Sequence, residues 1–283
     1  MSLSFCVLGS GSKGNCAVLV LRDGGDERYV LIDCGLSMRA TARRLAPLGI
    51  GIEQVSAILL THLDCDHYQV NWIRRIRAHG IGVYLHERHR NHALRCGLDG
   101  REIRMFREPF GLEGGTMIEP VMFAHDVVGS TGYIIEHGGA RLGWATDLGR
   151  VPATLLDRFS HLQALAIESN YDREMQLASH RPVFLKRRIM NGSGHLSNEE
   201  SLDAVLHIDG QSRLSHVVAL HLSEQCNDPR LVKRLYAESA PDLLDRLTIT
   251  HQRQPTPMLD VVGEETVGGC GRVRRRGEQT AMF

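Results

Sequence analysis

Four potential metal ligands lie within six residues of one another, directly after a short apolar segment at residues 57–60. They are His62, Asp64, Asp66 and His67. Imidazoles and carboxylates at alternate positions of an extended loop can approach a cation from one side, and the adjacent Asp-His pair can serve a second ion. A solvated turn could contain these residues by chance, but such density after a buried strand is unusual. The pattern predicts an α/β fold that binds ligands at the carboxyl end of a strand.

Two cations need more ligands than one loop provides, so the remaining ligands are expected at the ends of other strands. His125, Asp147 and His221 each follow an apolar, β-prone run. Any one of them alone would be better interpreted as a core histidine or a turn aspartate. Taken with the loop, the three residues predict a shared two-metal site.

The rest of the chain is predicted to form one large domain over residues 1–251. Its 42% hydrophobic content suits an ample core. Strand-like runs open the chain and fill residues 105–146, and helix-like and strand-like segments then alternate up to residue 251. From Gln252 the composition shifts to Gln, Pro, Gly and Arg with little apolar periodicity. Residues 252–283 are therefore predicted to be a flexible tail.

Charge and cysteine content restrict the environment and the partners of the protein. Lys and Arg together balance Asp and Glu at 33 each, so any binding to a polyanion must come from a local patch. The seven cysteines lack CxxC spacing and mostly sit in apolar runs. With no signal-like start and no apolar run of bilayer length, the sequence predicts a cytoplasmic protein without a membrane partner.

The order of Asp33, the loop at 62–67, His125, Asp147 and His221 resembles the five motifs of the metallo-β-lactamase superfamily, over nearly the whole chain before the tail. This resemblance implies a four-layer αββα sandwich. It also implies that one metal is held by His62, Asp64 and His125, that the other is held by Asp66, His67 and His221, and that Asp147 bridges them. Asp33 would orient the ligand loop from behind.

Asp64 departs from the family pattern, because most members have a histidine there. A carboxylate is a harder donor, which favours Mn²⁺ or Fe²⁺ relative to Zn²⁺. Alternatively, Asp64 does not bind a metal, and one site is weak or empty. The expected cofactors are two divalent cations, Zn²⁺ or Mn²⁺, with Fe²⁺ as a further candidate.

A finer resemblance is to the YycJ (WalJ) group of exonuclease-like proteins, and a more distant one is to tRNase Z-type enzymes and cyclic-phosphate phosphodiesterases. The finer one rests on residues 8–16, 168–172, 185–188, 194–198 and 221–227. It implies a metal-dependent phosphodiester hydrolase, an exonuclease-like enzyme with a DNA substrate, in which two metals activate a hydroxide. The sequence indicates no oligomeric state.

His195 and Asp66 are the candidate catalytic residues. His195 precedes Ser197, which resembles the start of a helix whose N-terminus would favour a phosphate, and it resembles the extra histidine of tRNase Z-type enzymes. The alternative is a surface histidine in a glycine-rich loop. The expected phosphate contacts are Lys186, Arg187 and Arg188 together with Ser10, Ser12 and Asn15 of the glycine-rich loop. A solvated helix face and a tight turn are equally good interpretations of these two segments.

Other functions remain open on the same scaffold. A small cyclic phosphodiesterase would need the same attack in a smaller pocket, and a thioester, lactone or β-lactam hydrolase would use the metals on a carbonyl group. A non-catalytic, metal-stabilised scaffold would have no need for both ligand sets. The complete set of ligand candidates therefore favours an enzyme.

Overall fold

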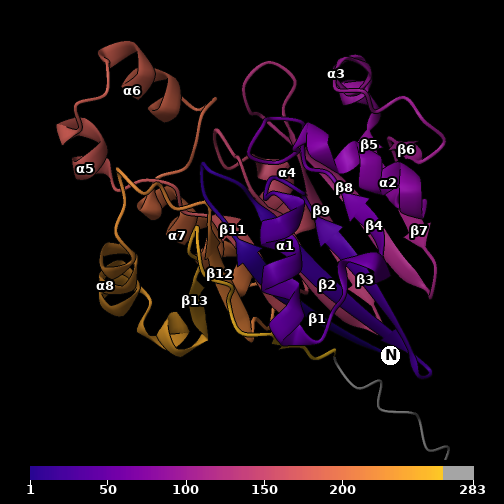
Figure 1. Ribbon diagram of the computed structural model, residues 1–283. Coiled ribbons are helices and arrows are strands. Elements are labelled where there is room, and N and C mark those ends of the chain that lie inside the picture. The colour runs from indigo at the N-terminus through magenta and orange to yellow at the C-terminus, as the bar shows by residue number, and fades with distance from the viewer. Residues whose placement is uncertain (264–283) are drawn as a thin grey trace, which may run out of the picture.

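Two β-sheets pack face to face in the computed structural model, which describes residues 1–263 (Figure 1). Within this part, each sheet has seven strands, in the orders β14-β1-β2-β3-β4-β5-β6 and β13-β12-β11-β10-β9-β8-β7. The first sheet contains β1 (Ser2–Gly9), β2 (Cys16–Asp23), β3 (Asp26–Ile32), β4 (Val55–Leu59), β5 (Gly82–His86), β6 (Ile103–Phe106) and β14 (Leu259–Val261). The second contains β7 (Phe110–Leu112), β8 (Thr116–Phe123), β9 (Ser130–His137), β10 (Ala140–Ala145), β11 (Ala164–Glu168), β12 (His216–Leu220) and β13 (Leu247–Ile249).

Helices cover the outer face of each sheet. The first sheet carries α1 (Met38–Leu45), α2 (Ile73–His79) and α3 (Arg90–Arg95), and the second carries α4 (Ala153–Arg158), α7 (Asn198–Asp209) and α8 (Pro229–Ser239). Two further helices, α5 (Arg173–Ala178) and α6 (Val183–Met190), project away from the sheets (Figure 1). The predicted αββα sandwich is confirmed.

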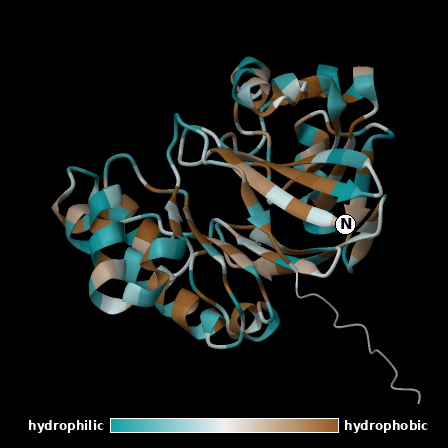
Figure 2. Ribbon diagram, turned by 90° about the horizontal axis from the view of Figure 1, so that it is seen from below, coloured by the Kyte–Doolittle hydropathy of each residue, from teal (hydrophilic) through white to brown (hydrophobic). Residues whose placement is uncertain are grey.

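Three apolar layers hold the sandwich together. Phe5, Leu19, Tyr133 and Trp144 belong to the layer between the sheets, and each outer layer lies between a sheet and its helices. Apolar segments concentrate in the strands (Figure 2). Since burying a large apolar side chain contributes about 1.5–3 kcal/mol, these layers fix how the two sheets lie against each other.

Both sheets contain a run of parallel strands. Strands β3 to β6 are parallel in the first sheet, and β10 to β13 are parallel in the second. Parallel neighbours end at the same edge of a sheet, so loops that follow them are close in space even when they are far apart in sequence.

The predicted boundary at residue 251 is wrong for the segment up to residue 263. Leu259–Val261 forms β14, which pairs with β1, and the buried Thr256 accepts a hydrogen bond from the backbone N–H of Val7 at 3.0 Å. The segment shows no apolar periodicity because β14 is only a short strand at the edge of the sheet. Its hydrogen bonds with β1 hold it there. The rest of the predicted tail lies outside the described residues.

None of the helices described between residues 1 and 263 is long and apolar enough to cross a membrane.

Candidate metal centre

A cavity of about 390 Å³ lies where the parallel strands of both sheets end. Asp33 follows β3, the ligand loop follows β4, Asp147 follows β10 and His221 follows β12. Such a volume falls within the range of about 300–1,000 Å³ that is usual for small-ligand sites. The fold therefore brings the predicted ligands of both halves to one place.

Three of these residues leave their strands through an unusual backbone conformation. Asp33, Asp147 and His221 have φ values of 61°, 55° and 56°. Residues with side chains rarely adopt this left-handed region, which costs of order 1–3 kcal/mol. The strain is tolerated because each strand end is held by its sheet. It turns Asp147 and His221 into the cavity and Asp33 toward the ring of His67.

His62, Asp64 and His125 form the first group, with one ligand atom from each within 4.8 Å of the others. The Nδ1–H of His125 donates to the carbonyl of Gly194 at 3.0 Å, which leaves Nε2 for the site. His62 is tied by its Nδ1 to Thr61 Oγ1 at 3.0 Å. Asp64 is half-buried and its Oδ2 lies 3.8 Å from His62 Nε2. These are the residues that the family resemblance implies for one metal.

Asp66, His67 and His221 form the second group, by the same criterion of 4.8 Å. The Nδ1 of His67 donates to Asp33 Oδ2 at 2.7 Å, so Asp33 orients the ring from behind. The Nε2 of His221 is buried and makes no hydrogen bond within residues 1–263, and Asp66 Oδ2 lies 3.5 Å from it. A buried ring nitrogen without a partner is costly unless it binds something.

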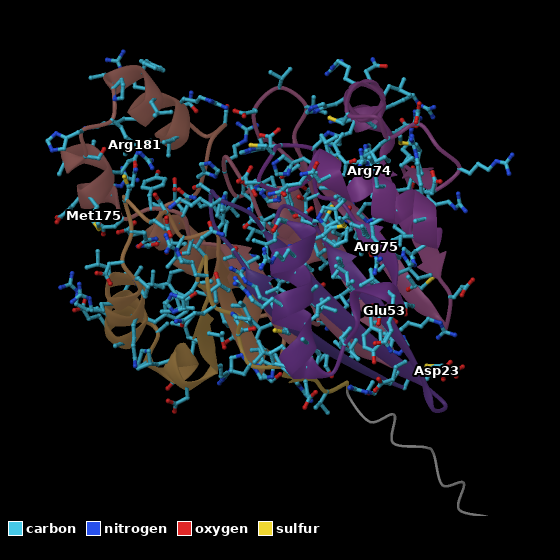
Figure 3. The ribbon with its side chains drawn as sticks, in the orientation of Figure 1. Asp23, Glu53, Arg74, Arg75, Met175 and Arg181 are labelled. Carbon is cyan, nitrogen blue, oxygen red and sulfur yellow. The ribbon has the colours of Figure 1, made fainter. Side chains whose placement is uncertain are left out.

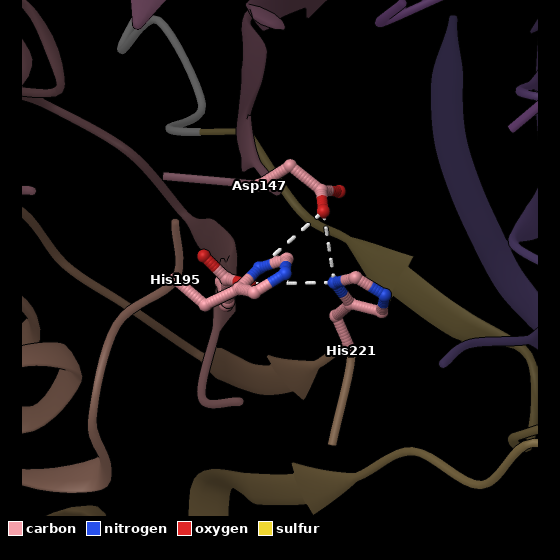
Figure 4. Close-up of side chains that lie close together, drawn as sticks. Asp147, His195 and His221 are labelled. Atoms are coloured by element: carbon pink, nitrogen blue, oxygen red, sulfur yellow. Dashed lines mark hydrogen bonds and ion pairs between the residues drawn. The ribbon is translucent and has the colours of Figure 1, made fainter. Parts of the chain in front are cut away.

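Asp147 lies between the two groups. Its Oδ2 is 3.0 Å from His67 Nε2, and its Oδ1 is 3.9 Å from His125 Nε2 and 3.0 Å from His221 Nδ1. Figure 4 shows His195 and His221 converging on this carboxylate. Two imidazole-carboxylate groups that share one carboxylate, with an unpartnered nitrogen among them, fit a pair of divalent cations.

The histidines and Asp147 shift one another's pKa values. Burial, the largest single influence, would lower the pKa values of His67 and His221, but Asp147 and the other carboxylates around each ring together raise both well above the usual value. Burial would raise the pKa of Asp147, but His221 and His67 hold it well below its usual value. Burial lowers the pKa of His62 well below its usual value. His67 and His221 must lose a proton before they bind metal.

His195 is joined to a residue that sequence reasoning did not assign to the site. Its Nδ1 donates to Glu168 Oε1 at 2.6 Å, and Glu168 is fully buried. Glu168 also accepts the backbone N–H of Leu148 at 2.7 Å, which links it to the Asp147 loop. The carboxylate fixes the ring, so Nε2 of His195 is free to act in the cavity that this residue lines.

The glycine-rich loop, residues 9–15, holds two of the ligands by hydrogen bonds to their backbone. Ser12 lines the cavity, but Ser10 and Asn15 are buried, which contradicts their predicted role as phosphate contacts. Ser10 Oγ accepts the backbone N–H of His221 at 2.8 Å, and the backbone N–H of Asn15 donates to the carbonyl of Asp66 at 2.7 Å. Both residues therefore hold ligands in place.

Gly35 permits the ligand loop to pack this closely. A Cβ atom at Gly35 would lie 1.7 Å from the carbonyl oxygen of Asp66. Any side chain there would displace the loop and with it the two ligands of the second group that the loop carries, Asp66 and His67. Cys65, at the tip of the same loop, is exposed.

Of the three basic residues on α6 that were predicted to contact phosphate, one lines the cavity and two do not. Arg188 lines the cavity and forms an ion pair with Asp126. Lys186 and Arg187 do not line the cavity; Lys186 donates to the carbonyl of Leu177, and Arg187 is exposed. Arg181, which sequence reasoning missed, lines the cavity from the turn between α5 and α6 (Figure 3). Nothing in the local sequence separates Arg181 from other arginines.

Comparison with known proteins agrees with this geometry. A family model described as a beta-lactamase superfamily domain matches residues 28–221. The exodeoxyribonuclease YycJ of Bacillus anthracis is 29% identical over 236 residues, which cover 82% of this chain and 87% of that protein. The exodeoxyribonuclease WalJ of Streptococcus pneumoniae is 27% identical over 232 residues, which cover 80% and 84%. Both family resemblances that the motifs indicated are confirmed.

Solved structures share the fold. A diphosphatase of the PhnP family superposes with a TM-score of 0.62 at 18% identity, covering 92% of this chain and 98% of that one. The short form of human tRNase Z superposes with a TM-score of 0.57 at 16% identity, covering 90% and 98%.

Proposed function

The chain belongs to the beta-lactamase superfamily and is a metal-dependent hydrolase, and on that basis we propose that it cleaves phosphodiester bonds of nucleic acid as an exodeoxyribonuclease-like enzyme. The observation that carries this proposal is the His195–Glu168 pair, which lies on the same cavity as both ligand groups. Hydrolysis of a phosphodiester releases a sugar alkoxide, which needs a proton as it leaves. The pair supplies an acid at that place.

The two ligand groups define what the cations would do. His62, Asp64 and His125 would hold one ion, Asp66, His67 and His221 the other, and Asp147 would contact both. When bound, two divalent cations lower the pKa of water and stabilise charge on the phosphate. Because Asp64 contributes a carboxylate to the first group, Mn²⁺ and Zn²⁺ are both candidates.

The protein's own residues orient the substrate and move protons. Asp66 lines the cavity with its side chain 19% exposed, so it can accept a proton from the attacking water. Glu168 accepts a hydrogen bond from Nδ1 of His195 and fixes the ring, so Nε2 is placed to pass a proton to the leaving oxygen. Arg181 and Arg188 line the cavity and can hold the phosphate or its neighbours.

DNA is the proposed substrate class because two relatives that each cover at least four fifths of this chain are named exodeoxyribonucleases. We further propose the cytoplasm as the location of the enzyme, from its cysteine pattern. A small cyclic phosphodiester, a carbonyl substrate and a purely structural metal site are the competing outcomes.

Metal reloading tests the proposal directly. The protein is stripped of metal, reloaded separately with Zn²⁺ and Mn²⁺, and given end-labelled single- and double-stranded DNA and RNA, with bis(p-nitrophenyl) phosphate as a small ester. We expect metal-restored digestion of DNA from one end. Cleavage of the small ester alone would indicate a small-molecule phosphodiesterase, and inertness toward every phosphodiester would favour a carbonyl hydrolase or a scaffold.

A further inference from the structure

The α5–α6 projection, residues 173–190, is a basic island in a chain with no net charge. It contains five Lys or Arg residues and a single Glu. Its inner side reaches the cavity through Arg181, Leu185, Arg188 and Ile189. Because the chain has no net charge, binding to a polyanion depends on a local cluster of cations, and this one lies beside the site.

Phe184 is an exposed aromatic side chain in the middle of this island. Its side chain is 73% exposed on α6, and it belongs to no ring contact or core cluster among residues 1–263. Residues three and four positions apart are neighbours on a helix, so Phe184 lies beside Arg187 and Arg188. An exposed phenyl ring between two cations has no role in holding the fold.

Helix α6 is fixed beside the cavity and does not simply extend into solvent. The Nε of Arg188 donates to Asp126 Oδ1 at 3.1 Å, and the backbone N–H of Asp126 donates to the carbonyl of Ser193 at 3.0 Å. These contacts join α6 to the loop that carries His125. Phe184 therefore has a defined place at the rim, next to the residues that would meet a scissile phosphate.

We propose that Phe184 stacks on an unpaired nucleobase at the rim of the cavity while Arg187 binds the adjacent phosphate. This inference rests on the proposed function, because it assumes a polynucleotide in the cavity. Every base offers a flat face, so stacking on a ring is tolerant of sequence, and a cation close to the ring matches the alternation of base and phosphate. A base inside a duplex is stacked between its neighbours and has no free face, so the rim prefers a single-stranded end.

A second copy of this chain is the competing occupant of the surface, since Leu177 and Val183 are also exposed there. Self-association through this face would bring two basic islands together, and like charges in contact oppose binding. Charge complementarity therefore favours a nucleic acid.

Binding to metal-free protein tests the inference without cleavage. Fluorescence anisotropy is recorded with a labelled single-stranded oligothymidine and with a blunt duplex, for wild type, Phe184→Ala, Phe184→Trp and Leu94→Ala. Leu94 is a matched exposed apolar residue on α3, away from the cavity lining. We expect Phe184→Ala to weaken single-strand binding about tenfold and duplex binding much less, with Trp retaining affinity.

Equal affinities of the Phe184→Ala and Leu94→Ala variants for the single strand would overturn the inference. A mass by light scattering that falls from dimer to monomer in Phe184→Ala would overturn it in favour of self-association. Failure of the proposed function would be detected separately, because metal-loaded wild-type protein would then cleave neither DNA nor bis(p-nitrophenyl) phosphate. Single-strand binding through Phe184 would support the inference even then.

Discussion

The floor and the rim of the cavity are built in opposite ways. The floor consists of His67, Asp147 and His221, which are almost fully buried. A ring nitrogen of each histidine lies 3.0 Å from a carboxylate oxygen of Asp147. The rim consists of α5 and α6, where Arg187 and Phe184 are exposed. A change in the floor leaves a buried charge unpaired, whereas a change in the rim removes one solvent-exposed contact. The floor should therefore control chemistry, and the rim should control which substrate is bound.

The largest effect is expected at the centre of the floor. Replacing Asp147 with Asn keeps the shape but removes the carboxylate between the ligand groups. Without this carboxylate the bound metal should be lost, so turnover of bis(p-nitrophenyl) phosphate should fall about a thousandfold, which corresponds to about 4 kcal/mol of activation free energy. Metal content by mass spectrometry and circular dichroism of the variant check this.

Asp126→Asn is the matched control, because the same exchange then alters only the ion-pair partner of Arg188 on the rim and should leave metal content unchanged. If Asp147→Asn retained both metals and its turnover, Asp147 would not be a ligand, and the contrast between floor and rim would disappear.

A smaller loss is expected where the floor meets the substrate. His195→Ala and Glu168→Gln should each lower turnover about a hundredfold while metal content stays normal, because general acid catalysis contributes roughly 10²–10⁴-fold. The double variant should be no slower than the slower single variant, since the two residues act as a unit. Loss of metal in His195→Ala would instead place this histidine among the ligands.

The pH dependence of the metal-free protein is a weaker effect. His67 and His221 have folded-state pKa values raised above 6.5, so their contribution to stability is present below pH 6.5 and is lost as the pH rises through the raised values. Asp147 acts in the opposite sense and loses its contribution only as the pH falls well below 3.8. Thermal unfolding of metal-free protein should therefore occur at lower temperature as the pH rises above neutrality.

Metal should reverse this trend, because rising pH removes the protons that compete for the ligand nitrogens. The comparison is a pair of melting curves at each pH, with and without Mn²⁺. A melting temperature that changed equally with pH in both series would mean that these histidines are not the groups that the metal replaces.

The two halves of the site differed in how far the sequence revealed them. The loop from His62 to His67 could be recognised because its ligands are contiguous and follow a buried strand. His125, Asp147 and His221 are scattered, and only their positions after β-prone runs and their order along the chain indicated a common site. The left-handed backbone of Asp33, Asp147 and His221 could not be foreseen, since it arises where a strand end is held by its neighbours.

Glu168 was missed because its role depends on a histidine 27 residues away. A buried carboxylate at the end of an apolar strand has no local signature of function. Ser10 and Asn15 were assigned to phosphate because a glycine-rich loop commonly presents N–H groups to anions. The structure turns both side chains inward, where they satisfy the backbone of His221 and of the loop itself.

The smallest effect is expected from a single cation of the rim. Arg187 is exposed, and its side chain has no hydrogen bond or ion pair with any residue between 1 and 263, so Arg187→Ala should leave the fold intact. If it contacts a phosphate, its loss removes about one released counterion, so the slope of log affinity against log salt should become shallower by about one. Arg95→Ala removes the same charge from α3, whose residues do not line the cavity. Titrations of single-stranded oligothymidine at several salt concentrations give both slopes. A shallower slope for Arg187→Ala alone would locate the polynucleotide at α6, whereas equal slopes would mean that phosphates pass elsewhere and that the rim does not select the substrate.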